Sequence, residues 1–329
     1  MRKKATTSSP IEIQFAPEVI TRVHSLLLTW YAAEQRNLPW RATSDPYAIL
    51  VSEMMLQQTQ VDRVLPKYAQ FLQAFPTLSD LATAPTAEVI SAWVPLGYNR
   101  RAVSLQSIAR QVVANYQGRI PDTIPDLLQL KGIGRYTAGA IACFAYHKQV
   151  ATVDTNIRRV LHRVFLGLEH PEPKANDAQM LLLAEEVLPA EQAYPWNQAL
   201  MDLGATICTS GDPQCINCPL QDVCTAYTDM TYYSLFPSGA VLRQLRKVAE
   251  KKSGYQSQPF TSTNRYFRGR IVDYLRSLPA DERIPLATLG PTIKAEYNEE
   301  HDLAWLQTLV SGLAKDGLLD YTEDGVRLP

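Results

Sequence analysis

Two closely spaced glycines between two helical stretches constrain the fold of this chain more than any other feature. A predicted helix ends at 127–130, the turn holds Gly132 and Gly134, and a second helix, rich in Ala and Gly, starts at Tyr136. Glycines at alternate positions let the backbone turn sharply and approach another backbone closely. The second helix presents its unpaired N-terminal N–H groups to whatever sits in the turn. The sequence therefore predicts an anion site, for which a DNA phosphate is well suited.

An aspartate, Asp154, follows this hairpin twenty residues after Gly134. It directly precedes a predicted helix that is indicated by apolar residues at helical spacing, namely Ile157, Val160, Leu161 and Val164. Each part alone has an ordinary explanation, because many turns between helices contain glycine and Asp is a common helix N-cap. Taken together with the features below, they favour a DNA-binding hairpin followed by an aspartate that takes part in chemistry.

The composition is that of a globular protein. The chain has 329 residues, of which 46% are hydrophobic and 20% charged, so we expect two or three domains. No apolar run is long enough to span a bilayer. Residues 1–16 lack the apolar segment of a secretory signal, so we expect a disordered tail and a cytoplasmic protein that associates with the nucleoid when bound to DNA. The net charge is −1, so any nucleic-acid binding must depend on a local basic face.

Four of the five cysteines lie within seventeen residues, at Cys208, Cys215, Cys218 and Cys224. Without an export signal, this cluster indicates a metal site rather than disulfides. Four thiolates at short spacing suit either a zinc ion or a [4Fe–4S] cluster, and the spacing alone leaves both open. The fifth, Cys143, falls in an apolar helix and is predicted to be a small core residue.

The first 228 residues show helical periodicity throughout. Amphipathic or apolar helical patterns cover 17–33, the run from Pro46 to Pro76, 84–94 and 102–116, and no long stretch alternates as strands do. We therefore predict a mainly α fold for this part of the chain.

A glutamate, Glu53, interrupts the apolar run that follows Pro46. A carboxyl group in apolar surroundings has a raised pKa, which suits a general acid at neutral pH. The alternative is that Glu53 lies on the solvent side of its helix, where Glu is usually found. The local pattern does not choose between these two.

Six motifs, taken in order, resemble those of one family. They are LPWR at 38–41, SEMMLQQTQV at 52–61, PLGYNRRA at 95–102, KGIGRYTAGAIA at 131–142, VDTNIRRVL at 153–161, and the cysteine cluster. Their order and spacing resemble the MutY-type A/G-specific adenine DNA glycosylases, which belong to the helix-hairpin-helix, iron–sulfur glycosylase superfamily. The resemblance covers residues 17–228, and six consecutive matches are far more specific than one.

The resemblance implies a fold and a reaction. It implies an iron–sulfur cluster domain from 17–37 and 148–228, a six-helix domain with the helix-hairpin-helix at 38–147, and a [4Fe–4S] cluster on the four cysteines. It also implies a monofunctional enzyme that excises mispaired adenine, opposite 8-oxoguanine or guanine, in base excision repair. We expect a monomer whose partner is double-stranded DNA with a mispaired or damaged base, and no membrane partner.

The resemblance also implies residue roles. Glu53 protonates the purine and helps to activate water, Asp154 stabilises the positive sugar, and Asn156 orients these groups. Tyr136 stands where the related glycosylase-lyases carry a nucleophilic Lys, so little strand cleavage is expected. The residues implied to bind DNA or the flipped base are Trp40, Arg41, Leu56, Gln57, Gln58, Tyr98, Gly132 and Gly134. Two neighbours of Asn156, Arg158 and Arg159, either add charge for a phosphate or form a solvated helix face.

The C-terminal part departs from the family pattern. Residues 229–262 read as a linker, and 263–329 as a winged-helix-like domain of three helices and a hairpin that turns at Asp324-Gly325. Family members usually carry a β-rich domain here that senses 8-oxoguanine. The last predicted helix, 302–315, has one Lys and no Arg, so we expect no DNA contact from this domain, and weaker discrimination of A·8-oxoG over A·G. Asn99 and Thr155 are smaller departures.

Three other functions stay open on the sequence. A related mismatch glycosylase would act on another base, such as thymine opposite guanine. An endonuclease III-like lyase would need the missing Lys at Tyr136. A non-catalytic, DNA-binding iron–sulfur redox sensor would not need both Glu53 and Asp154, and their presence argues against it.

Overall fold

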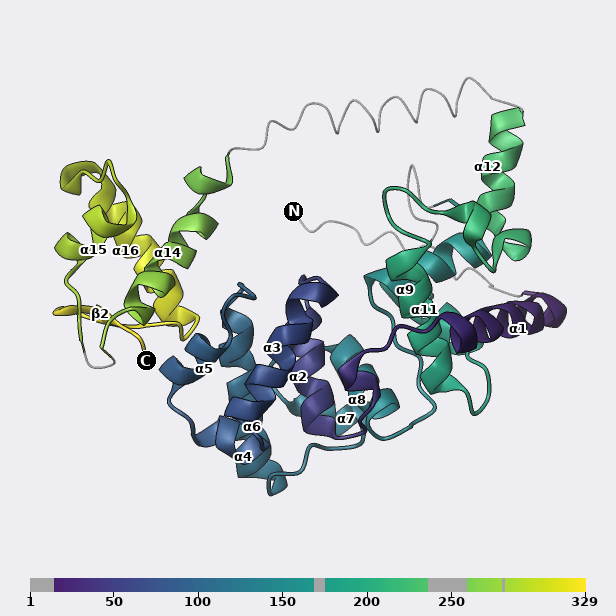
Figure 1. Cartoon of the computed structure of the whole chain (residues 1–329), viewed down its shortest axis with the longest axis horizontal. Helices are drawn as coiled ribbons and strands as arrows, with labels where there is room; N and C mark the ends of the chain where they lie inside the picture. Colours follow the sequence, from purple (N-terminus) through teal and green to yellow (C-terminus); the bar gives the residue numbers. More distant parts are fainter. Residues whose placement is uncertain (1–14, 169–174, 236–258, 280–281) are drawn as a thin grey trace, which may run out of the picture. The chain divides into compact units, whose positions relative to one another are not determined.

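The computed structural model describes residues 15–168, 175–235, 259–279 and 282–329. The chain folds into two compact units (Figure 1). We call residues 1–37 and 142–254 the cysteine unit, and residues 38–141 and 255–329 the hairpin unit. Almost all of the predicted N-terminal tail and most of the predicted linker lie outside the described residues, so both stay predictions.

The hairpin unit begins with a series of short helices, visible in the dark-blue to teal part of Figure 1. They are η1 (Pro39–Arg41), α2 (Pro46–Leu56), α3 (Val61–Ala74), α4 (Leu78–Thr83), α5 (Thr86–Ala92), α6 (Arg100–Tyr116), α7 (Ile124–Gln129) and α8 (Arg135–Phe144), the last of which continues into the cysteine unit. Side-chain caps begin several of them: Asp45 accepts from two N–H groups of α2, and Thr123 accepts from Asp126 of α7. Such caps satisfy N–H groups that have no partner within the helix.

The predicted helical pattern is confirmed, with one difference in the apolar run after Pro46. That run forms two helices, α2 and α3, because the chain turns at 57–60, where Gln58 adopts a left-handed φ of 56°. The pattern at 84–94 corresponds to α5, and that at 102–116 to α6. Within the described residues up to 235, the regular elements are all helical.

The cysteine unit is also helical. Its elements are α1 (Pro17–Glu34), α9 (Thr155–Leu161), the π-helix η2 (His162–Leu166), α10 (Asp177–Glu186), α11 (Ala193–Thr206), η3 (Cys215–Asn217), η4 (Gln221–Val223) and α12 (Thr225–Leu235). Leu27 of α1, Ile157 of α9 and Trp196 of α11 meet in its core, each almost fully buried. Helix α12 extends into the stretch predicted as linker.

The C-terminal elements of the hairpin unit are a short 3-10 helix, three α-helices and a β-hairpin. They are η5 (Phe260–Ser262), α14 (Asn264–Arg276), α15 (Leu286–Ile293), α16 (Glu299–Lys315), β1 (Asp320–Thr322) and β2 (Gly325–Arg327), with β1 antiparallel to β2. Thr263 caps α14 by accepting from the N–H of Tyr266. The predicted elements are present, while their assignment to a winged-helix domain stays a prediction.

These C-terminal helices share a core with the earlier part of the hairpin unit. Ile271 of α14, Val310 of α16 and Val326 of β2 are buried together with Ile90 of α5. The N–H of Ala87 also donates to the carbonyl of Pro329, at 2.9 Å. The C-terminal elements therefore pack on α5. Among the helices in the described ranges, none combines the length and apolar character needed to cross a bilayer.

Candidate active site

Glu53 lies in the interior of α2 and is 5% exposed. Its chain neighbours Val51, Met54 and Met55 are also buried. The structure therefore decides between the two positions left open by the sequence, and Glu53 is not on the solvent side of its helix. A carboxyl group shielded from water holds its proton more firmly, which is the environment that a general acid needs.

The LPWR motif forms the short helix η1. Trp40 is buried and packs edge-on against Tyr68, with 5.3 Å between the ring centres, while Arg41 is half-buried. Leu56, at the end of α2, is also half-buried. The burial of Trp40 agrees with a structural role, and the contribution of these three residues to a base pocket stays a prediction.

Gln58 and Tyr98 lie on exposed loops of the hairpin unit, and both adopt left-handed backbone conformations, with φ of 56° and 48°. Such conformations are uncommon for non-glycine residues and persist only where the surroundings fix them. Tyr98 is 41% exposed, so its ring is not part of the hydrophobic core. The side chain of Gln58 is available to a ligand, whereas the ring of Tyr98 already contacts the guanidinium groups of Arg101 and Arg265.

A buried arginine that the sequence analysis missed joins these two loops. Arg101 is 8% exposed and donates to the carbonyls of Met54 (3.1 Å) and Met55 (2.8 Å), and to that of Gln57, at the C-terminal end of α2. It also donates to the carbonyl of Gly97, at 3.1 Å. Helix ends leave carbonyls without partners, and a cation is favourable there. Burial lowers the pKa of Arg101 to about 10.

The predicted hairpin joins α7 to α8. Gly132 has a φ of 114°, and a Cβ at this position would lie 3.3 Å from Ile108, so both its conformation and its surroundings favour glycine. Gln111 of α6 holds the turn through two hydrogen bonds with Lys131. Its side chain accepts from the N–H of Lys131 at 2.8 Å and donates to the carbonyl of Lys131 at 3.2 Å. Gln111 is a second positioning residue that the sequence analysis missed.

The start of α8 has the features of an anion site. Gly134 is exposed, and a Cβ there would meet no heavy atom within 4 Å. Tyr136, in the first turn of α8, is half-buried. The exposed glycines leave the helix N-terminus open to a phosphate.

The second candidate carboxylate, Asp154, belongs to the cysteine unit. Its side chain caps α9 by accepting from the N–H of Ile157 at 2.7 Å, and it accepts from Nδ2 of Asn156 at 3.2 Å. Burial raises the pKa of Asp154, although these two donors and the nearby Arg159 act in the opposite direction. Asp154 is therefore the N-cap of α9. This position is compatible with a catalytic role, because the residue is only half-buried and a ligand can still reach it.

Arg159 ties the Asp154 turn to the following chain. It donates to Oδ1 of Asn156 (2.8 Å) and to the carbonyls of Gly204 (2.7 Å) and Cys208 (2.8 Å). Arg158 donates to Asp177 and to the carbonyl of Ala175. Both arginines form hydrogen bonds with groups of their own unit. These contacts correspond neither to the predicted phosphate contact nor to the predicted solvated helix face.

Gly204 of α11 lies against Asn156. A Cβ on Gly204 would lie 2.7 Å from Cβ and 3.2 Å from Cα of Asn156. Such a contact is too short, so glycine is required for α11 to approach the start of α9. The sequence analysis missed this residue because the contact joins positions 48 apart in the chain.

The four clustered cysteines fold around η3 and η4. Cys208, Cys218 and Cys224 pack against the core of the cysteine unit, and Arg163 donates to Sγ of Cys208 at 3.4 Å. Burial raises the pKa of Cys218 to about 12, and the other three thiols add to the shift. A thiol whose ionisation is disfavoured by its neighbours in this way suits a bound metal, whose positive charge would relieve the repulsion. Within the described ranges, no three His, Cys, Asp or Glu side chains are already arranged to hold a metal ion.

Cys143 is separate from this cluster, as predicted. It is fully buried and accepts from Nδ2 of Asn197 at 3.3 Å. Burial raises the pKa of its thiol to about 11.

The predicted site residues divide between the units. The hairpin unit holds Glu53, Gln58, Tyr98, the hairpin glycines and Tyr136, whereas the cysteine unit holds Asp154, Asn156 and the four cysteines. Within each unit, long-range contacts of Arg101, Gln111 and Arg159 hold the functional segments in place.

Comparison with known proteins identifies the family of the chain. Residues 51–185 match the HhH-GPD superfamily of base excision DNA repair proteins. The chain is 36% identical to the adenine DNA glycosylase of Mycolicibacterium smegmatis, over 91% of this chain and 93% of that protein. It is 39% identical to the adenine DNA glycosylase of Mycobacterium tuberculosis, over 91% of this chain and 90% of that protein. The chain therefore belongs to the adenine DNA glycosylase family of the HhH-GPD superfamily.

Two solved structures share the fold of about two thirds of the chain. A thermostable thymine-DNA glycosylase matches with a TM-score of 0.60 and 33% identity, over 64% of this chain and 98% of that one. An endonuclease III in a complex with DNA matches with a TM-score of 0.58 and 19% identity, over 66% of this chain and all of that one, which shows the common fold alone. The mycobacterial matches reach further along the chain, and must include more than half of residues 263–329.

Proposed function

We propose that the protein is a monofunctional DNA glycosylase that removes adenine mispaired with guanine or 8-oxoguanine in base excision repair. The observation that supports this most is the buried carboxyl group of Glu53, in a chain that resembles adenine DNA glycosylases over almost its whole length. A base inside a duplex cannot be reached, so adenine must first leave the stack at a cost of a few kcal/mol.

The two carboxyl groups have different tasks in the proposed reaction. Glu53 donates a proton to a ring nitrogen of adenine, so that the base leaves as a neutral molecule when the N-glycosyl bond breaks. The electron pair of that bond stays with the base, and the sugar becomes positively charged. Asp154, as a carboxylate, stabilises this charge, as the second carboxylate does in glycoside hydrolysis. Glu53, now ionised, accepts a proton from the attacking water.

Other residues bind and position the DNA in this proposal. Gln58 and Tyr98 fill the gap that the flipped base leaves, while the amides near Gly132 and Gly134 hold a phosphate. Asn156 orients Asp154 through their hydrogen bond. Tyr136 cannot form a Schiff base with the sugar, so the reaction ends with base release.

We also propose a [4Fe–4S] cluster bound by Cys208, Cys215, Cys218 and Cys224. The donor set and the location of the thiols in one compact segment support it. Bound there, the cluster would join four points of residues 208–224 and stabilise the fold of that segment.

Thymine opposite guanine is a second candidate substrate, because the chain is 33% identical to a thymine-DNA glycosylase over 98% of that protein. The match covers 64% of this chain, whereas the adenine DNA glycosylases of mycobacteria match 91% of it. A buried general acid also suits a purine, whose ring nitrogens accept a proton.

Single-turnover base release from four duplexes tests the choice. They carry A·8-oxoG, A·G, A·C and T·G pairs at one position in an otherwise constant sequence. Release of adenine from the first two, and no release of thymine, agrees with the proposal. Thymine release from T·G that is faster than any adenine release would replace it by the second candidate.

A further inference from the structure

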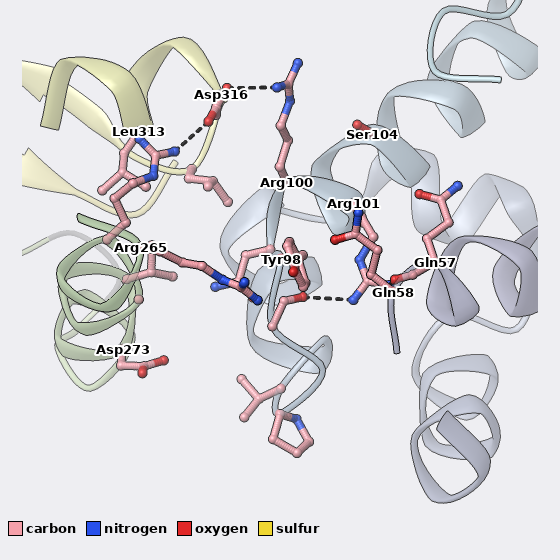
Figure 2. A pocket seen from close by; sticks show the side chains of 18 of the residues that line it. Gln57, Gln58, Tyr98, Arg100, Arg101, Ser104, Arg265, Asp273, Leu313 and Asp316 are labelled. Atoms are coloured by element: carbon pink, nitrogen blue, oxygen red, sulfur yellow. Dashed lines mark hydrogen bonds and ion pairs between the residues drawn. The ribbon is translucent and has the colours of Figure 1, made fainter. Parts of the chain in front are cut away.

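The guanidinium group of Arg101 binds two loops of the hairpin unit at once. We call them the Gln58 turn, residues 57–60, and the Tyr98 loop, residues 93–99. Nη1 donates to three carbonyls at the end of α2 and the start of the Gln58 turn, those of Met54 (3.1 Å), Met55 (2.8 Å) and Gln57. Nη2 donates to the carbonyl of Gly97, in the Tyr98 loop, at 3.1 Å. Figure 2 shows Arg101 with Tyr98 on one side and Gln58 on the other.

Both loops contain a backbone conformation that needs support from its surroundings. Gln58 and Tyr98 have φ values of 56° and 48°, and left-handed non-glycine residues persist only where neighbouring groups fix them. The carbonyl of Gln57 directly precedes Gln58, and that of Gly97 directly precedes Tyr98. Arg101 therefore holds the peptide group that leads into each of these two residues.

Arg101 is fixed in place and carries its charge. It is 8% exposed, and its Cζ atom lies 5.4 Å from the ring centre of Trp93, which is fully buried. Nε1 of Trp93 donates to the carbonyl of Gly97 at 3.2 Å, so two donors hold that carbonyl. Burial lowers the pKa of Arg101 to about 10, which still leaves the group protonated at neutral pH. Hydrogen bonds from a charged donor are stronger than those from a neutral one.

The other two arginines of α6 have different surroundings. The side chain of Arg100 is 72% exposed and lies 3.6 Å from the carboxylate of Asp316. Arg110 also binds backbone carbonyls, but its Nε donates to that of Ala82, which belongs to α4 and lies outside both loops. The link between the Gln58 turn and the Tyr98 loop is therefore specific to Arg101 among the arginines of this helix.

The geometry of a guanidinium group suits such a link. Its two terminal nitrogens belong to one rigid plane, so the carbonyls that they bind are held at a fixed spacing. The ammonium group of a lysine is a single point on a flexible stem and cannot reproduce this fork. Arg101→Lys therefore keeps the charge while removing the fixed spacing.

We propose that Arg101 is a positioning residue for base flipping, because it holds the Gln58 turn and the Tyr98 loop at the spacing at which both side chains enter the gap in the duplex together. This role rests on the proposed function, in which these two side chains replace the flipped adenine. The ring of Tyr98 leaves Arg265, 4.1 Å from its centre, when it enters the duplex, whereas its backbone stays held by Arg101. Loops that are ordered beforehand lose less free energy when they bind.

Single-turnover adenine release from two duplexes, with saturating full-length protein, separates positioning from folding. The first duplex has one A·G pair, and the second has the same pair between two mismatched pairs, so that its adenine is easier to flip. Arg101→Lys should reduce release by at least ~30-fold from the first duplex and by less than ~5-fold from the second. Its Tm should stay close to that of the wild type. A residue needed only for folding would reduce release from both duplexes equally.

Arg110→Lys is the matched control, because it makes the same substitution on the same helix at another arginine that binds a carbonyl. It should reduce release from both duplexes equally, and by less than ~3-fold. A selective loss in this control, equal to that of Arg101→Lys, would contradict the assignment.

A second test determines whether Arg101 acts through the two loops. In a protein that already carries Gln58→Ala and Tyr98→Ala, the further change Arg101→Lys should reduce release from the first duplex by less than ~2-fold, because there is no side chain left to position. The same loss as in the otherwise wild-type protein would show that Arg101 acts elsewhere.

The remaining outcomes separate this role from the proposed function. Equal losses from the two duplexes in Arg101→Lys, an unfolded Arg101→Lys protein, or full activity on both duplexes would each overturn the role of Arg101 and leave the proposed function in place. A wild-type protein that releases no adenine from either duplex would overturn the proposed function itself.

Discussion

Asn156 donates a hydrogen bond of 3.2 Å from Nδ2 to Oδ2 of Asp154, and in turn accepts one of 2.8 Å from Arg159. The carboxylate that caps α9 is thus oriented by a residue that is itself held in place. Its orientation does not depend on a bound ligand.

Replacing this carboxylate by an amide should separate catalysis from stability. In Asp154→Asn the side chain still caps α9, because Asn is as good an N-cap as Asp, but the negative charge is lost. We expect adenine release to fall by ~10²-fold or more. Single-turnover kinetics with saturating enzyme measures this change.

The effect of Asp154→Asn on stability follows from the direction of its pKa shift. Burial raises the pKa of Asp154 in the folded state, so above its unfolded pKa the ionised group destabilises the fold. The variant also loses the acceptor for Nδ2 of Asn156, because an amide has one accepting oxygen. The test is therefore the pH dependence: as the pH rises through the pKa of Asp154, the Tm difference should shift in favour of the variant. A shift in favour of the wild type would show that the pKa shift has the opposite sign.

Gly204→Ala should disturb the same turn from the opposite side. The added methyl group would lie 2.7 Å from Cβ of Asn156, so the start of α9 or α11 must move. We expect a loss of about 1–3 kcal/mol in the free energy of unfolding, and slower adenine release. Gly211→Ala is the control, because a Cβ there meets no heavy atom within 4 Å. Equal stability of the two variants would contradict the packing argument.

The sequence predicts the elements that depend on residues close together in the chain. Helical periodicity predicts α5 and α6, and the paired glycines predict the hairpin between α7 and α8. The turn between α2 and α3 was missed, because neither Gly nor Pro marks it and a non-glycine residue, Gln58, adopts the left-handed conformation there.

The contacts that position the site depend on residues far apart in the chain. Arg101 reaches the carbonyl of Met54 across 47 positions, and Arg159 reaches that of Cys208 across 49. In the sequence each of them stands beside another arginine, and for Arg159 a phosphate contact or a solvated helix face was predicted. In the structure both bind carbonyl groups. The contact of Arg265 with Tyr98 could not be predicted either, because no local pattern relates α14 to that loop.

The cysteine assignments predict different results for two serine variants. Purified wild-type protein should be brown and contain about four iron atoms per chain. Cys218→Ser should lose iron and unfold at a lower temperature, since one point of attachment is removed. Cys143→Ser should keep the iron, because its thiol contacts Asn197 in the core. Zinc as the sole metal in protein purified without oxygen would refute the cluster assignment.

Tyr136 predicts the absence of a covalent intermediate. Borohydride should trap little or no enzyme–DNA adduct with the wild type, because a phenol does not form a Schiff base with the sugar. Tyr136→Lys should gain trapping, and Tyr136→Phe, which keeps the ring, should not. Efficient trapping of the wild type, seen as a protein–DNA band on a denaturing gel, would place the protein among the lyases.

The central claim is that Glu53 supplies the proton for adenine release, and Glu53→Gln tests it most directly. Gln has nearly the same size but no acidic proton, so single-turnover release from A·8-oxoG or A·G duplexes should fall by at least ~10²-fold while the Kd for the duplex stays similar. Glu88→Gln, an exposed carboxylate in the same unit, should react at the wild-type rate. Adenine release by Glu53→Gln within ~10-fold of the wild type, at equal folding and binding, would contradict the account.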